Sequence, residues 1–548
     1  MNAAVVCFVG LAALALGYRF YSKIIATKVF DLRDDEPVPS VELEDGVDFV
    51  PTNKHILFGH HYSSIAGAAP IIGPAIAVVW GWVPAFLWVV FGSIFMGAVH
   101  DFSTLVISMR NEGRSIGSIA ADVISPRTRT LFLLVIFCLV LLVIAVFATA
   151  IAGLFVGFPG TVLPVNFEIL VAVGIGWWCY KKKGGMLWPS IAALIALYFM
   201  VWVGTEVPLS LSFVGDKPAQ ITTWVVLLMI YGFIASTLPV WVLLQPRDYI
   251  NSHQLVVGLT ALIAGIFIAA PTIQAPMFTA APEGSPSWFP FLFVTVACGA
   301  ISGFHGLVSS GTTSKQIACA SDARAVGYGA MLGEGVLALI ATLAVSAGLS
   351  DWASHYDHFP TTKEGVGAFV NGASSFLVAL SIPEHAAKVV VGVLVISFAA
   401  TSLDTGVRIQ RYIVQELAET YSISWFKNRY LAGLVAVVPP LLLVLAGQER
   451  LLWPLFGSGN QLLAGLSLVV VTIWLIKLKR PYLYLLIPCL VVLAITTLAL
   501  VINIAEYATA SEPQYHLAAV GALLLGLQLW VIAEGALAVR NLRAAAPR

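Results

Sequence analysis

The sequence alternates between long apolar stretches that carry almost no charge and short polar segments that carry its basic residues. All but four of the 29 lysines and arginines fall in every second connection between these stretches. Only 11% of the residues are charged and 59% are hydrophobic, whereas a soluble domain carries roughly 25% charged residues. Such a chain cannot build an ordinary solvated surface. The pattern predicts an all-α membrane protein that crosses the bilayer many times.

One helical crossing needs about 20 apolar residues. By this measure we predict about 15 transmembrane helices, at residues 2–18, 56–80, 83–109, 130–157, 166–180, 187–205, 222–245, 254–272, 291–313, 326–348, 386–406, 431–447, 452–476, 482–504 and 515–537. The apolar stretch 365–383 is interpreted as a re-entrant or surface helix, because another crossing there would place the basic residues from Arg408 to Arg429 outside.

Basic residues stay on the cytoplasmic side during membrane insertion. Their distribution therefore predicts an N-terminus outside and a C-terminus inside. Four regions follow: an extra transmembrane helix at 1–18, a cytoplasmic linker at 19–54, a core at 55–410, and C-terminal helices at 411–548 that complete the membrane domain. No connection is long enough to hold a soluble catalytic domain. Chemistry must therefore occur among the helices.

Two of the predicted helices contain helix-breaking residues. Stretch 56–80 holds two prolines four residues apart, and stretch 222–245 holds a proline after Ser236 and Thr237. Proline frees the carbonyl four residues before it, and such a carbonyl in hydrocarbon must face a polar cavity. We expect a substrate site at these two breaks, formed by Gly67, Ala68, Pro70, Gly73, Ser236, Thr237, Pro239 and Trp241.

The two stretches lie five crossings apart and therefore run in opposite directions. This is the pattern of an inverted repeat of five plus five helices with discontinuous helices around a central site. The alternative is that glycine and proline are simply common in membrane helices.

Ionisable residues inside a membrane are functional candidates, because a charge at the bilayer centre costs at least about 2.5 kcal/mol. Asp101, His305 and Glu334 each lie eight residues from the inner end of a predicted helix, or about 12 Å. We expect them to communicate through one polar cavity. The alternative is that each is a structural polar anchor.

His305 also belongs to a polar stripe with Ser302, Ser309 and Thr312, which are spaced to share one helical face. A stripe of this kind lines a cavity or a tight helix contact. His60 and His61 at the cytoplasmic start of stretch 56–80, and Asp404 beside Arg408, are candidates for an inner gate.

Histidine titrates near neutrality, which favours a proton as the coupling ion. Sodium is the alternative, bound by the hydroxyls of Ser309, Ser310, Thr312 and Thr313 together with carbonyls near Ala66. With no Lys or Arg expected at mid-membrane, an anionic substrate would be held by the exposed amide ends of the broken helices. The six cysteines are scattered without metal-binding spacing, and no cofactor or metal site is indicated.

The sequence contains several long motifs: PTNKHILFGHH at 51–61, AGAAPIIGP at 66–74, LPVWVLLQPRDY at 238–249, ACGAISGFH at 297–305, SSGTTSKQ at 309–316, TSLDTGVR at 401–408 and LWPLFGSGNQ at 452–461. Through these motifs the chain resembles the carbon starvation protein A family of bacterial inner-membrane peptide and pyruvate transporters.

The resemblance implies a relative of the amino acid–polyamine–organocation superfamily with a LeuT/APC-like core. It implies ion-driven uptake of a peptide or a short carboxylate such as pyruvate across the bacterial inner membrane, as in the response to carbon starvation. The partners are then a small-molecule substrate and the lipid bilayer, with no nucleic acid. This chain departs from the expected family pattern at His100, where we expect an uncharged amide beside Asp101.

Other functions compete with this reading. An intramembrane enzyme would need a metal motif or a Ser-His-Asp set, and the sequence carries neither H-E-x-x-H nor a credible triad. A nutrient sensor would use the same ligand site with segment 19–54 as its output. Substrate accumulation in liposomes that contain this protein alone would separate a transporter from a pure sensor.

Overall fold

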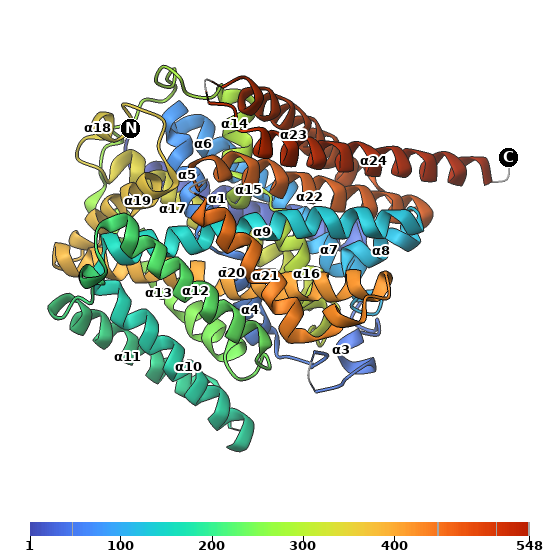
Figure 1. Ribbon diagram of the computed structural model, residues 1–548, viewed down its shortest axis with the longest axis horizontal. Helices are drawn as coiled ribbons and strands as arrows, with labels where there is room; N and C mark the ends of the chain where they lie inside the picture. Colours follow the sequence, from blue (N-terminus) through green and yellow to red (C-terminus); the bar gives the residue numbers. More distant parts are fainter. Residues whose placement is uncertain (47, 183, 447–448, 511, 546–548) are drawn as a thin grey trace.

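A computed structural model describes residues 1–46, 48–182, 184–446, 449–510 and 512–545. Within these ranges the regular elements are all helices, apart from two isolated β-bridges. Twelve helical segments are long and apolar enough to cross a membrane, and a bent helix pair raises the number to 13. The helices run mostly along one direction, and the N-terminus and the last turn of α24 lie at opposite ends of that direction (Figure 1).

The helices of the first half are α1 Ala3–Leu16, α2 Ser22–Ile24, α3 Pro39–Glu42, α4 Lys54–Ile65, α5 Ala69–Ala77, α6 Trp82–Leu87, α7 Ala98–Met109, α8 Ile116–Val123, α9 Pro126–Gly157, α10 Val162–Lys182, α11 Leu187–Glu206, α12 Lys217–Thr237 and α13 Leu244–Ala269. Those of the second half are α14 Trp288–Thr295, α15 Ala297–Ala300, α16 Gly303–Gly311, α17 Ala330–Ala347, α18 Trp352–His355, α19 Thr362–Val378, α20 Glu384–Thr420, α21 Arg429–Leu445, α22 Glu449–Lys477, α23 Leu483–Thr509 and α24 Tyr515–Ala545. Wider π-helical turns at Gly17–Tyr21, Ile25–Val29, Trp88–Gly97 and Arg324–Gly329 join α1 to α2, extend α2, join α6 to α7 and precede α17.

All fifteen predicted stretches lie on helical parts of the structure, although they do not all form long straight spans. Stretch 56–80 is the bent pair α4–α5. Stretch 291–313 is divided among α14, α15 and α16, and stretch 431–447 corresponds to the shorter helix α21 and ends in residues outside those described. Fifteen crossings therefore stays a prediction.

The predicted region boundaries differ from the structure at two places. The first span runs from Ala3 to Val29, so the linker starts about ten residues later than the predicted 19. Helix α20 continues from Glu384 to Thr420, so no structural boundary exists at 410–411. In both cases basic side chains on the last turns of a span were taken as the start of a connection.

The polar segment after the first span lies against the helical bundle. Ser40 Oγ donates to Ile317 O at 2.5 Å, and Arg110 pairs with Glu36 at 2.6 Å. Arg480 hydrogen-bonds to Asp31, which lowers the pKa of that carboxyl below its usual value. The predicted linker is thus attached to the bundle at several points.

Helix α19, in the stretch we interpret as re-entrant, begins with a capping box in which Thr361 and Glu364 satisfy each other's backbone amides. It packs against α5, α13, α17 and α20. The buried residues of this 17-residue helix lie along one side of it. Whether it re-enters or crosses the membrane stays an interpretation.

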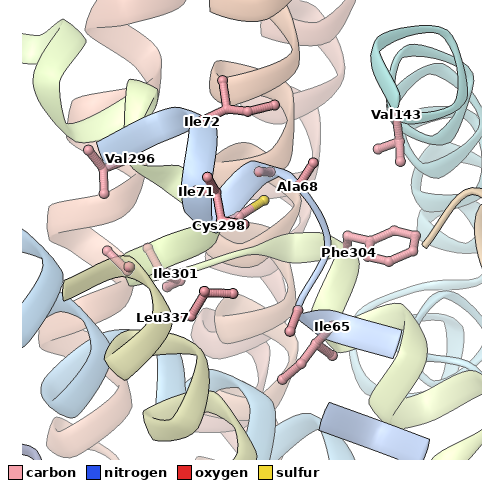
Figure 2. Packing of buried hydrophobic residues seen from close by; sticks show 14 of the residues in the cluster. Ile65, Ala68, Ile71, Ile72, Val143, Val296, Cys298, Ile301, Phe304 and Leu337 are labelled. Carbon is pink, nitrogen blue, oxygen red and sulfur yellow. The ribbon is translucent and has the colours of Figure 1, made fainter. Parts of the chain in front are cut away.

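Two helical segments break in the middle of the bundle and contact each other there. Helix α4 ends at Ile65, and α5 leaves at 48° to it after Ala66–Ala68. In the second segment, Ile301 and Ser302 are extended and separate α15 from α16. Figure 2 shows Ile71 and Ile72 near Val296, and the turn at Ala68 near Cys298. A Cβ on Gly73 would lie 2.3 Å from Thr295 O, so glycine permits this contact.

The predicted second break, in stretch 222–245, is not a break within a helix. Helix α12 is continuous and ends at Thr237, and residues 238–243 form a turn that leads to α13. Pro239 therefore terminates a helix. The second interrupted segment is residues 288–311, seven crossings after α4–α5.

Candidate functional site

A buried charged cluster joins three helices at the bundle centre. His305 on α16 places Nδ1 2.9 Å from Asp101 Oδ2 on α7, and Nε2 3.1 Å from Glu334 Oε2 on α17. All three side chains have at most 1% exposure. The structure therefore brings together the three residues that sequence depth alone placed at one level.

His100 adds a second imidazole to this cluster. Its Nδ1 lies 2.8 Å from Asp101 Oδ1, so both carboxylate oxygens of Asp101 face a histidine. Helix α16 can approach because residue 306 is glycine: a Cβ there would lie 2.9 Å from His100 Cε1. Among the described residues, His100 Nε2 has no hydrogen-bond partner.

The hydroxyls predicted for an ion site point in different directions. Ser309 Oγ is buried without a hydrogen-bond partner in the described chain. Ser310 Oγ donates to Gly306 O and accepts from Ile116 N. Thr312, which caps the end of α16, donates to Val308 O.

Thr313 Oγ1 lies 2.8 Å from His61 Nδ1. His61 thus faces the end of α16 and not Asp404, with which it was grouped as a gate. Ser302 lies in the extended stretch before α16, where its hydroxyl meets Asn460. The polar stripe is consequently shorter than the spacing predicts.

The predicted residues of the first break lie at the bend of α4–α5. Gly67, Ala68, Pro70 and Gly73 are all buried there. A Cβ on Gly67 would lie 2.6 Å from Ser402 Oγ on α20. This bend therefore contacts α20 on one side and the interrupted segment 288–311 on the other.

The other predicted binding residues lie at the end of α12. Ser236 and Thr237 donate to carbonyls of their own helix, and Trp241 stacks on Tyr180 with ring centroids 4.0 Å apart. Pro239 is exposed. These four do not line an interrupted helix.

A second buried network surrounds Arg247. This side chain is 2% exposed and contacts Asp404, Tyr231 and Thr401 on neighbouring helices. Tyr231 also donates to Asp404 at 2.7 Å. The network joins α12, α13 and α20.

Asp248, the residue after Arg247, contacts the first bent helix. His60 Nδ1 lies 2.7 Å from Asp248 Oδ2, and Ser63 donates to the Asp248 carbonyl. His60 and Asp404, two of the three gate candidates, therefore contact neighbouring residues of α13. Glu168 on α10 is buried and accepts from Ser397 at 2.9 Å.

The predicted stretches leave Arg247 in the connection between residues 245 and 254, whereas the structure buries it within the span Leu244–Ala269. Helix α13 begins at Leu244, ten residues before the predicted 254, so Arg247 and Asp248 lie in its first turns. The signal was present: Pro246 is typical of the first turn of a helix. Glu168, near the start of the predicted stretch 166–180, is likewise buried.

The chain is similar to known proteins over most of its length. The sequence profile of the family described as carbon starvation protein CstA matches residues 2–356 and 349–499. The peptide transporter CstA of Bacillus subtilis is 33% identical over 92% of this chain and 90% of its own length. The pyruvate/proton symporter BtsT of Escherichia coli is 32% identical over 85% of this chain and 76% of its own.

Among solved structures, a mutant manganese transporter of Eremococcus coleocola superposes with a TM-score of 0.43 at 12% identity, covering 92% of this chain and 99% of that one. We infer nothing from so low a score. The profile match and the two relatives suffice, and this chain belongs to the carbon starvation protein CstA family, as a multi-pass membrane transporter.

Proposed function

We propose that this protein is a proton symporter that takes up a small organic nutrient, either a peptide or a short carboxylate such as pyruvate. The observation that carries the proposal is the placement of His305 between two carboxylates, Asp101 and Glu334, in a buried site. Relatives named as a peptide transporter and as a pyruvate/proton symporter give the two substrate classes.

The geometry supports a proton over sodium. An imidazole between two carboxylates can exchange a proton with either one, and desolvation makes the charge of each group depend on the others. The hydroxyls that would hold sodium are dispersed, since Thr313 faces His61 and Ser310 faces Ile116. Of the four, only Ser309 has an unused buried oxygen within the described chain.

The arrangement of spans supports a five-plus-five inverted repeat with revised limits. Five spans run from α4–α5 to α11, and five run from α14–α16 to α22 if α19 does not cross; α12 and α13 lie between the two sets. Each set begins with an interrupted segment, and these segments contact each other. Asp101 then lies in the second span of the first set and Glu334 in the second span of the other.

The two interrupted segments of this repeat form the proposed substrate site. Discontinuous helices expose backbone amides and carbonyls at mid-membrane, where they can hold a carboxylate and a coupling ion. We place the substrate beside the bend at Gly67 and Ala68 and the extended residues Ile301 and Ser302, which lie close to the His305 cluster in the chain.

Gradient-driven uptake into proteoliposomes tests the proposal. Purified protein is given labelled pyruvate or a labelled dipeptide, with an imposed proton gradient or an imposed sodium gradient. We expect accumulation of one compound with the proton gradient alone, and loss of accumulation in His305→Ala. The control is His516→Ala, at the exposed start of α24.

Uptake driven by sodium alone would overturn proton coupling. Binding of either compound without any accumulation would favour a nutrient sensor over a transporter. The attachment of Asp31, Glu36 and Ser40 to the bundle leaves little freedom for the output segment that a sensor of this kind needs.

A further inference from the structure

A pocket of about 500 Å³ opens where the end of α12 meets α20 and the start of α21. Helices α12, α20 and α21 lie side by side (Figure 1). Four of the lining side chains are basic and one is acidic: Arg408, Arg411, Lys427, Arg429 and Asp48. The basic residues belong to the end of the bundle that the charge distribution assigns to the cytoplasm.

The cations of this pocket are not neutralised by carboxylates. None of the four takes part in an ion pair within 4.0 Å between the residues that the structure describes. Arg408 uses Nη2 on the carbonyls of Ala235 and Leu238, both at 2.8 Å. Its Nε is buried and has no partner among the described residues.

Arg411 makes the strongest case. It is only 7% exposed, and its buried Nε likewise has no hydrogen bond in the described part of the chain. Its guanidinium carbon lies 4.6 Å from the centroid of the adjacent Tyr412 ring. A buried charge without a partner is costly, so an anion from solution or from the bilayer would satisfy it.

The donor set fits a phosphate group. The guanidinium fork of Arg411 can bond two oxygens of a tetrahedral anion. Arg408 keeps an Nη1 group that the two carbonyls do not use, and Lys427 and Arg429 at the exposed side add charge. A single carboxylate would leave several of these donors unused. Basic pockets on the cytoplasmic side of membrane helices are also where anionic lipid headgroups bind.

We propose that this pocket binds a phosphate-bearing anion, either an anionic phospholipid headgroup or a soluble phosphate compound from the cytoplasm. The occupant bridges α12, α20 and α21. Because Tyr231 on α12 and Asp404 on α20 both contact Arg247, a bound anion holds together two of the helices that enclose the Arg247 network.

Thermal unfolding of the full-length protein tests this site. The protein is placed in nanodiscs of zwitterionic phosphatidylcholine, and its unfolding temperature is followed in two titrations. One adds inorganic pyrophosphate, and the other raises the fraction of phosphatidylglycerol in the disc. A ligand that binds only the folded state raises the unfolding temperature, and the rise grows with the ratio of ligand concentration to dissociation constant.

The test variants are Lys427→Gln with Arg429→Gln, and separately Arg411→Gln. The matched control is Arg540→Gln with Arg543→Gln, two exposed basic residues near the end of α24. We expect the wild type and the control to respond alike. Loss of two charge-assisted hydrogen bonds should weaken the apparent affinity of the Lys427 and Arg429 variant by at least about tenfold.

Stabilisation by pyrophosphate without anionic lipid would identify a soluble phosphate ligand, and stabilisation by phosphatidylglycerol alone would identify a lipid headgroup. Either result, when reduced in the pocket variant and not in the control, supports the site. No response to either compound, or equal responses of the pocket and control variants, would overturn it. Lys427 and Arg429 are exposed, so the variant that replaces these two residues keeps the test valid if Arg411→Gln does not fold.

Discussion

At the scale of single residues, the buried pair of Arg247 and Asp404 is where a small change should have a large effect. Removing one partner leaves a charge buried without compensation, which costs about 3 kcal/mol or more. We expect Asp404→Asn to lower the stability of the detergent-solubilised protein by that amount, measured by denaturant unfolding.

Replacing both charges, with Arg247→Met and Asp404→Leu, should cost roughly half as much or less, because no unpaired charge remains. A double variant that is as unstable as Asp404→Asn would show that the pair is not the source of the loss. The two measurements together separate an electrostatic effect from a packing effect.

A second residue-scale prediction concerns His100, which faces Asp101 at 2.8 Å. His100→Gln keeps a hydrogen-bond donor of similar size and removes a group that can carry charge. We expect the pH dependence of uptake to change while the protein remains folded. An unchanged pH profile would mean that His100 only positions Asp101.

Asp101, His305 and Glu334 lie together in the structure, as their equal distances from the predicted helix ends suggest, and their role in coupling stays a prediction. The burial of Glu168 and Arg247 could not be predicted in this way, because burial depends on which neighbouring helix covers a residue. Periodicity within one helix holds no information about that neighbour.

At the scale of elements, the contact between the two interrupted segments depends on glycine. A methyl group at position 73 would meet the carbonyl oxygen of Thr295. We expect Gly73→Ala to cost about 1–3 kcal/mol through overpacking and to reduce uptake by separating the segments. Gly174→Ala on α10, where a Cβ would meet nothing within 4 Å, is the control and should change stability by less than about 1 kcal/mol.

The measurement is unfolding temperature and uptake on the same preparations. If Gly73→Ala matched Gly174→Ala in both, the close approach of the two segments would have no energetic weight.

One helix break was predicted wrongly from the sequence. Pro239 was taken as a break within a helix, although a proline can equally end a helix. Only the position at which the next helix starts distinguishes the two cases.

At the scale of the whole molecule, the charge pattern predicted the fold class because charge is costly in a bilayer and is therefore scarce in the spans. The sides on which the two termini lie stay a prediction. The proposed repeat was harder to predict, because α12 and α13 lie between its two sets of spans and are themselves apolar enough to cross a membrane.

In the proposed mechanism, substrate movement and proton movement both depend on the His305 cluster. Glu334→Gln removes the proton site of the carboxylate and keeps its size. We expect this variant to exchange labelled substrate for unlabelled substrate across the membrane, since exchange needs no net proton transfer. It should fail to accumulate substrate against a gradient.

The most direct measurement records internal pH with an enclosed dye while substrate enters proteoliposomes. The account predicts substrate-dependent acidification with the wild type and with Glu506→Gln on α23, and none with Glu334→Gln, although exchange continues. Acidification by Glu334→Gln at the wild-type rate would contradict the assignment of the coupling proton to this cluster.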